Sequence, residues 1–266
     1  MLDTNAHGRI EVCHDMLNLQ KYVRSIQNMG FFSFARYWWH QKSNLPRTGV
    51  FDLTSPISGH PLQCRAGTSD IDVFKHVYVL REYAMFDGLE KPGLIVDCGA
   101  NVGMSTAYFL ARHPGAQVIA VEPDQGNYRQ LMHNTRHYGQ RVRAVQAGVW
   151  SKDIGLNFVK DGFGDGRAWA IAVEEARLDE EPDLHAVSIP ALLNDSGHDR
   201  IALLKVDIEG SELALFSEGA ESWLCRVDHL VIELHGHACE QAFYKAIEPY
   251  DFEIEQSGGV VVCRSR

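Results

Sequence analysis

From Leu94 onward, short apolar segments alternate with helical patterns, and this alternation constrains the fold more than any other feature of the chain. Alternating strands and helices are typical of a mostly parallel sheet covered by helices on both faces. Strands are predicted at 94–96, 118–121, 142–145, 201–206 and 230–232, and helices at 104–112, 128–138, after Ser211 and at 242–247. The sequence therefore predicts an α/β domain over residues 91–266, preceded by a boundary at Glu90–Gly93.

The end of the chain carries a different signal. Two apolar segments, Phe252–Ile254 and Val260–Val262, are separated by Ser257-Gly258-Gly259. A pair of short apolar runs around a glycine-containing turn predicts a β-hairpin. We therefore expect the last strand to run antiparallel to the others.

Four of the predicted strands end in an acidic residue: Asp97, Glu122, Asp207 and Glu233. In a parallel sheet the carboxyl ends of the strands lie along one edge, and ligands of open α/β sheets bind there. Ionised carboxylates repel one another unless hydrogen-bond donors or a cationic ligand offset their charge. We therefore expect these acids to surround a ligand site.

The turn after the first strand has the spacing G-x-x-x-G, from Gly99 to Gly103, and not the G-x-G-x-x-G of a dinucleotide site. The glycines let the backbone approach a ligand, and Asn101 tolerates the left-handed conformation. Glu122, after the second strand, is placed to accept hydrogen bonds from both ribose hydroxyls. These features favour a nucleoside ligand that bears an ammonium group. A nicotinamide-dependent oxidoreductase is the alternative class of enzyme, because such enzymes also have an acidic residue after the second strand.

Three blocks of the chain, Ile95–Ser105, Val121–Asp124 and Leu204–Glu212, resemble the signature blocks of the FkbM family of S-adenosylmethionine-dependent methyltransferases. The resemblance covers roughly Thr68 to Glu233. It implies a class I methyltransferase (Rossmann-like) fold with a seven-stranded sheet and an antiparallel last strand. It also implies O-methyl transfer to a hydroxyl of a sugar, a glycan or a secondary metabolite. The residues expected to bind the cofactor are Asp97, Gly99, Ala100, Asn101, Gly103, Ser105, Glu122 and Asp207.

An alcohol that attacks a methyl group must lose its proton, so a general base is expected beside the cofactor. Asp207 and Glu209, at the end of the fourth strand, are the first candidates. His235 is the next candidate, because a neutral imidazole is a suitable base near pH 7. The acids and histidines show no recognisable metal-ligand spacing, so no metal is predicted.

Residues 1–90 differ from the rest and are predicted to form a helical and lid segment that selects the substrate. A helix is expected over 12–26, ending near Gly30, and a second over 73–86. Asp70 and Tyr83 are expected to face the substrate. The aromatic residues between Phe31 and Trp39 would stack on a sugar, or pack against the core or a partner subunit, which leaves a homo-oligomer open.

The 25 Lys and Arg against 35 Asp and Glu give a net charge of −10. This charge disfavours nucleic acid and anionic membrane surfaces as partners, because both are bound mainly through Lys and Arg. No apolar run approaches the length of a membrane span, and the first residues do not resemble a signal peptide. A cytoplasmic enzyme with a small-molecule or glycan acceptor is predicted. A non-catalytic cofactor-binding module remains a further alternative.

Overall fold

The computed structural model describes residues 26–42, 48–158, 173–177 and 181–265. The chain forms two compact units, Met1–Glu82 and Tyr83–Arg266, so residues 83–90 belong to the second unit rather than to the N-terminal segment. Of the helix predicted over 12–26, only Ile26 lies within the described residues. None of the described helices is long and apolar enough to cross a membrane.

The first unit contains a helix, a hairpin and a second, irregular helix. Helix α2 spans Phe31–Lys42, and the antiparallel strands β1 (Val50–Leu53) and β2 (Leu62–Arg65) follow it. Helix α3 (Asp70–Phe74) continues into the π-helical turn η1 (Lys75–Val79). The predicted helix over 73–86 is therefore interrupted, because Arg81 adopts a left-handed φ of 58° before the 3₁₀ turn η2 (Ala84–Phe86).

The second unit is built on a seven-stranded sheet with the order β12-β13-β11-β10-β3-β4-β5. The parallel strands are β3 (Leu94–Cys98), β4 (Gln117–Val121), β5 (Val142–Val145), β10 (Leu203–Val206) and β11 (His229–Glu233). The terminal hairpin joins β12 (Phe252–Ser257) to β13 (Val260–Ser265), and β13 runs antiparallel to β11. The predicted α/β fold with a reversed last strand is confirmed.

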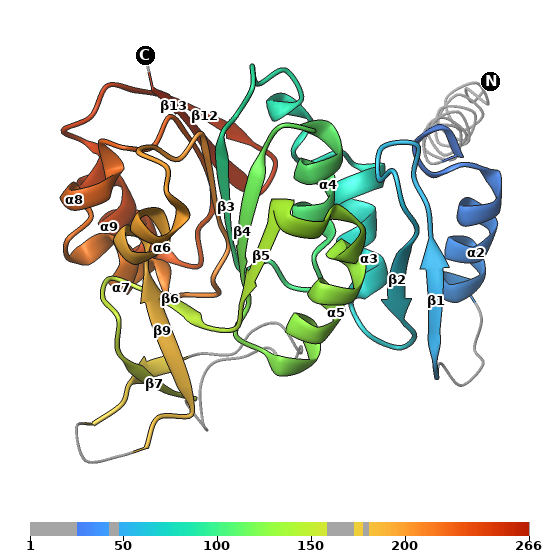
Figure 1. Cartoon of the computed structure of the whole chain (residues 1–266), viewed down its shortest axis with the longest axis horizontal. Helices are drawn as coiled ribbons and strands as arrows, with labels where there is room; N and C mark the ends of the chain where they lie inside the picture. Colours follow the sequence, from blue (N-terminus) through green and yellow to red (C-terminus); the bar gives the residue numbers. More distant parts are fainter. Residues whose placement is uncertain (1–25, 43–47, 159–172, 178–180, 266) are drawn as a thin grey trace, which may run out of the picture. The chain divides into compact units, whose positions relative to one another are not determined.

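Helices cover the two faces of this sheet, with α4 (Met104–Arg112) and α5 (Gln125–Thr135) on one side (Figure 1). On the other side lie α6 (Ile189–Ser196), α7 (Glu212–Ser217), α8 (Glu221–Leu224) and α9 (His237–Ile247). A short 3₁₀ segment, η3 (Arg136–Arg141), leads into β5. The buried ring of Phe216 packs on Trp223 and Phe243, with centroid distances of 5.6 and 5.1 Å. These rings join α7, α8 and α9 in the core.

No element was predicted between β5 and residue 201, where the described residues form four short strands and a helix. The strands β6 (Gly148–Trp150), β7 (Gly155–Phe158), β8 (Val173–Glu175) and β9 (Leu184–Ser188) form a sheet of order β6-β9-β7-β8. Runs of three to five residues are too short for periodicity to be recognised. The sequence does carry a signal for the start of helix α6. Ser188 is the N-cap, its hydroxyl accepts a hydrogen bond from the Ala191 amide, and Pro190 stands in the first turn.

Candidate active site

The loop between β3 and α4 has the backbone conformation expected from its sequence. Gly99, Asn101 and Gly103 all have positive φ, at 75°, 49° and 81°. A Cβ atom at Gly99 would lie 1.7 Å from the carbonyl oxygen of Asp207. Because no side chain fits at position 99, the backbone of the loop after β3 packs directly on the backbone after β10, with the Ile208 side chain beside it.

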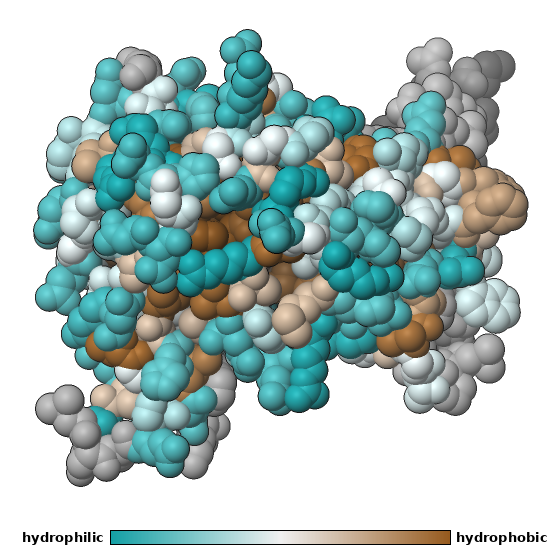
Figure 2. Space-filling model, in the orientation of Figure 1, coloured by the Kyte–Doolittle hydropathy of each residue, from teal (hydrophilic) through white to brown (hydrophobic). Residues whose placement is uncertain are grey.

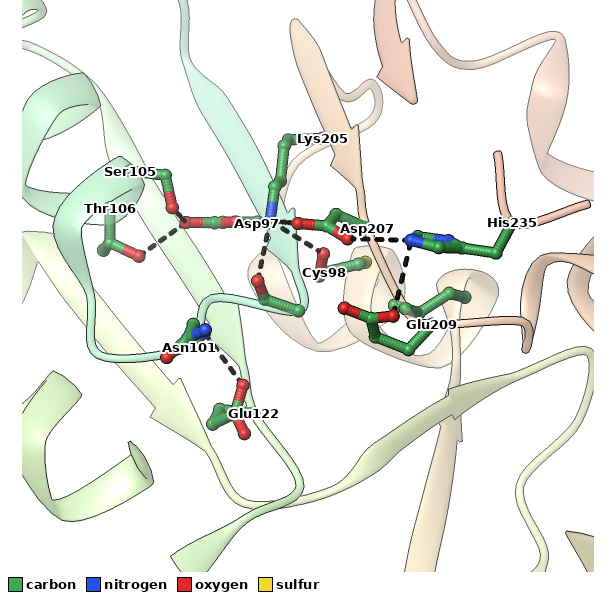
Figure 3. Close-up of polar contacts among 12 residues, drawn as sticks. Asp97, Cys98, Asn101, Ser105, Thr106, Glu122, Lys205, Asp207, Glu209 and His235 are labelled. Atoms are coloured by element: carbon green, nitrogen blue, oxygen red, sulfur yellow. Dashed lines mark hydrogen bonds and ion pairs between the residues drawn. The ribbon is translucent and has the colours of Figure 1, made fainter. Parts of the chain in front are cut away.

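A buried lysine lies between two of the strand-end acids. Lys205, on β10, has its Nζ 3.4 Å from Asp97 Oδ1 and 3.5 Å from Asp207 Oδ2, and it donates to the Gly99 carbonyl oxygen at 2.6 Å (Figure 3). Burial opposes its charge, but the two carboxylates raise its pKa well above the usual value. The ammonium group of Lys205 therefore offsets part of the negative charge of Asp97 and Asp207.

Asp97 is fully buried behind this lysine. Its Oδ2 accepts hydrogen bonds from the hydroxyls of Ser105 (2.7 Å) and Thr106 (2.6 Å) in the first turn of α4. The carboxylate therefore anchors α4 and Lys205. It does not line the open cavity that lies at the carboxyl edge of the sheet, and neither do Ala100, Gly103 and Ser105.

Glu122 lies at the end of β4, as its position in the sequence predicts. Its carboxylate accepts hydrogen bonds from the amides of Asn101 (2.8 Å) and Asp124 (3.0 Å), and the Asn127 side chain donates at 3.4 Å. Burial raises the pKa of Glu122 to about 7, although these donors favour the ionised form. Further hydrogen-bond donors, such as the hydroxyls of a ligand, would favour the ionised form of this carboxyl group.

The turn after β10 presents Glu209 in an unusual backbone conformation. Glu209 has a φ of 53°, and Gly210 follows with a φ of 102°. Glu212, which is fully buried, fixes this turn by accepting hydrogen bonds from the amides of Ile208 (3.0 Å) and Gly210 (2.8 Å). Ser211 stands at the N-cap position of α7 but makes no side-chain cap hydrogen bond.

His235 stands among the acids of this turn. Its Nδ1 lies 2.9 Å from Glu212 Oε1, and its Nε2 lies 3.4 Å from Glu209 and 3.9 Å from Asp207. Although burial lowers its pKa, the hydrogen bond with Glu212 and the neighbouring negative charges raise it to about 9. A pKa of about 9 favours the protonated imidazole at pH 7, whereas a general base must be neutral, so a role of His235 as the base stays a prediction.

The pKa of Glu209 is also raised, but for an acid this favours the neutral form. Burial, together with the charges of Asp207, Glu233 and Glu212, raises its pKa to about 7 despite the nearby His235. Asp207, Glu233 and His235 also offer ligand atoms within 4.8 Å of one another. His235 lies closer to Glu209 than to Asp207, and Asp207 is also 3.5 Å from the Lys205 ammonium.

An open cavity joins these groups along the carboxyl edge of the sheet. It is lined by Gly99, Asn101, Glu122, Asp207 and Glu209. Its apolar lining comes from Val121, Val149, Leu184 and Ile208. Apolar walls, a buried carboxylate and a second acid suit a ligand with an aromatic base, vicinal hydroxyls and positive charge.

Two predicted substrate residues have other partners. Asp70, in the first unit, is fully buried, and Arg65 binds both of its oxygens, with Nε 2.9 Å from Oδ2 and Nη2 2.8 Å from Oδ1. Tyr83, in the second unit, is buried against Phe109, with ring centroids 5.2 Å apart. In the structure Asp70 therefore holds the start of α3 to β2, and Tyr83 packs beside α4.

Lys205 and Glu212 were not recognised from the sequence. A lysine inside the run Leu-Leu-Lys-Val should have been noticed, because a charge in a central strand must be paired when it is buried. Lys205 and Asp207 are also two residues apart, so they project to the same face of an extended chain. The role of Glu212 had no such signal, since it depends on a left-handed turn.

The model of the FkbM methyltransferase domain matches residues 97–256. Methyltransferase 1 of Beauveria bassiana is 28% identical over 158 residues, covering 53% of this chain and 64% of that protein. The AMB antimetabolite synthetase AmbE of Pseudomonas aeruginosa is 24% identical over 199 residues, covering 61% of this chain and 9% of that protein. The chain thus spans less than two thirds of both relatives.

Among solved structures, fibrillarin of Aeropyrum pernix with natively bound S-adenosylmethionine is 10% identical. The match covers 69% of this chain and 73% of that one, with a TM-score of 0.40.

Proposed function

Because the chain belongs to the FkbM methyltransferase family and S-adenosylmethionine is its cofactor, we propose that it transfers the methyl group to a hydroxyl oxygen. The observation that carries this proposal is Glu209, a cavity-lining carboxylate whose pKa is raised to about 7 beside the His235 imidazolium. An alcohol needs a base of this strength at neutral pH, because it must lose its proton as it attacks.

We further propose how the cavity residues hold the cofactor. The Glu122 carboxylate accepts hydrogen bonds from the ribose hydroxyls. The backbone of Gly99–Asn101 contacts the methionine part of the cofactor, and Asp207 faces the positively charged end of the cofactor. The apolar residues Val149 and Leu184 suit the adenine ring. When bound, the cofactor supplies a methyl group activated by its sulfonium. Asp97 acts indirectly, through Lys205 and α4.

The protein's part in the reaction is to align the acceptor and to remove its proton. The ionised Glu209 accepts the hydroxyl proton while the new oxygen–carbon bond forms and the sulfur–carbon bond breaks. His235, 3.4 Å away, keeps part of the Glu209 population ionised. The proton then passes from Glu209 to solvent, because Glu209 is half-buried and lines an open cavity.

A sugar, glycan or secondary-metabolite hydroxyl is the acceptor class we propose. The name of AmbE, an antimetabolite synthetase, supports a link to specialised metabolites, although that protein is far longer than this chain. We retain residues 1–90 as the segment that selects the acceptor.

Isothermal titration and isotope transfer test this function. We expect micromolar binding of S-adenosylhomocysteine, and transfer of a labelled methyl group to a hydroxyl compound when cell extract is treated with the enzyme. Enhancement of NAD(P)H fluorescence would instead indicate the oxidoreductase. Cofactor binding with no labelled product from extract or from an alcohol panel would indicate a non-catalytic module, and a labelled amine or carbon product would contradict O-methylation.

Glu122 makes cofactor affinity depend on pH. We expect S-adenosylhomocysteine to bind about tenfold more tightly at pH 8 than at pH 6, because the ribose hydroxyls donate to the ionised carboxylate and its pKa is about 7. Titrations across this range measure the effect. In Glu122→Gln the pH dependence should flatten and affinity should fall, whereas Glu209→Gln should retain the dependence. A wild-type affinity that is constant with pH would contradict the ribose assignment.

Glu212 contacts both the turn that carries Glu209 and His235, so it should influence the acidic limit of activity. In Glu212→Gln the side chain keeps its shape but loses the charge that raises the pKa of His235. His235 then loses its positive charge at a lower pH and lowers the pKa of Glu209 less, so we expect the rise of kcat near pH 7 to move to higher pH, with KM little changed. The pH profile of kcat for Glu212→Gln measures this, with exposed Glu218→Gln as the control. An unmoved acidic limit would show that Glu212 only stabilises the turn.

A further inference from the structure

Helix α2 turns an aromatic face to solvent. Phe31, Ala35, Trp38 and Trp39 have spacings of three, four, seven and eight residues, which place them on one side of a helix. The exposed fractions are 66% for Phe31, 47% for Trp38 and 56% for Trp39, and neighbouring Phe32 is 88% exposed. Soluble helices usually place such residues inward. In Figure 2, tan hydrophobic surface lies over α2.

The opposite side of α2 is fixed to its own unit through polar contacts. The Ser33 hydroxyl is buried and lies 2.6 Å from the Thr54 hydroxyl. Arg36 donates to the carbonyl oxygen of Asp52 at 2.8 Å. These bonds hold the helix against β1 with its aromatic face outward, so the exposure of the rings does not result from a loosely attached helix.

The sequence around α2 is basic, although the chain as a whole is acidic. No acidic residue occurs between Asp15 and Asp52, although the chain has 35 Asp and Glu. The same stretch contains five basic residues, Lys21, Arg24, Arg36, Lys42 and Arg47, of which the structure describes the side chain of Arg36. The net charge of −10 is a sum over the whole chain, so it does not show that the sequence around this aromatic helix is basic.

We propose that α2 docks on a bilayer surface that contains anionic phospholipid. Trp and Phe rings insert at the boundary between headgroups and acyl chains, and Lys and Arg are attracted to anionic headgroups. A bilayer satisfies both parts of the pattern at once. A second copy of the chain fits less well, because a symmetric contact would bring two basic segments together. The proposal goes beyond the methyl transfer and does not depend on it.

Vesicle flotation with the full chain tests the proposal. We expect flotation with vesicles of phosphatidylcholine and about 30% phosphatidylglycerol, weaker flotation with phosphatidylcholine alone, and weakening at about 500 mM salt. Tryptophan emission should shift to shorter wavelength on binding. Phe31→Ser with Phe32→Ser should weaken binding by about tenfold or more while leaving Trp38 and Trp39 as reporters.

The matched control replaces exposed apolar residues of the second unit, Tyr244→Ser with Ile254→Ser, and should bind vesicles as the parent does. Thermal melting and S-adenosylhomocysteine titration of each variant separate a docking defect from loss of fold or cofactor site. Absence of flotation with anionic vesicles would overturn the proposal. So would flotation that the Phe31→Ser and Phe32→Ser changes leave intact, or a dimer in solution that they abolish.

Discussion

Glu209→Gln is expected to lower kcat by about 10²–10⁴-fold, the range typical of losing a positioned general base. The amide is nearly the same size as the carboxylate but cannot take the hydroxyl proton. Because Glu209 is proposed to act on the acceptor, affinity for S-adenosylhomocysteine should change by less than about threefold, which is under 1 kcal/mol. Initial rates with the labelled methyl donor, together with calorimetric titration, measure the two effects.

Two comparisons make this prediction specific. Glu240→Gln, at an exposed residue of α9, should leave both quantities unchanged. In the parent, kcat should rise as pH increases through about 7, because the basic form of Glu209 is the ionised one; this acidic limb should disappear in Glu209→Gln. A variant that retains full turnover would remove Glu209 as the base and leave Asp207, another acid that lines the cavity, as the candidate.

Lys205→Met is expected to destabilise the protein by about 3–5 kcal/mol, the cost typical of removing one partner from a buried ion pair. Lys205 is 4% exposed, and its ammonium lies 3.4 Å from Oδ1 of the fully buried Asp97. Without it, the Asp97 carboxylate is buried without this positive charge beside it. Urea denaturation at pH 7 measures the loss.

The double variant Asp97→Asn with Lys205→Met separates charge from packing. Removing both charges eliminates the unpaired carboxylate, so the double variant should recover part of the stability lost in the single variant. The exposed pair Arg200–Asp228, at 2.6 Å, provides the control, since Arg200→Met should cost at most about 1 kcal/mol. Equal losses at Lys205 and Arg200 would show that the buried pair is not needed for stability.

The central sheet was predictable because most of its strands consist mainly of apolar residues and are bounded by turn residues. Leu94–Val96, Val118–Val121 and Val142–Val145 all lie within observed strands, and the glycine turn identified the final hairpin. The small sheet from β6 to β9 was not predictable, because a three-residue strand such as β6 is stabilised by its neighbours and has no pattern of its own.

The position of the site was also predictable, but its electrostatics were not. Parallel strand ends bring Glu122 and Asp207 to one cavity, as strand order requires. Whether His235 is neutral depends on Glu212, which lies 23 residues earlier in the chain and 2.9 Å away in space. A pKa is set by such three-dimensional neighbours, so the sequence alone could not show that the pKa of His235 is raised to about 9.

The contact between the loop after β3 and the chain after β10 limits how this enzyme can be redesigned. The peptide at Gly99 meets the carbonyl of Asp207 with no room for even one methyl group. One loop lines the proposed cofactor subsite, and the other leads directly to Glu209. Their spacing is therefore fixed by main-chain atoms and is beyond adjustment by side-chain exchange. Variants that seek a new acceptor should therefore leave both loops intact.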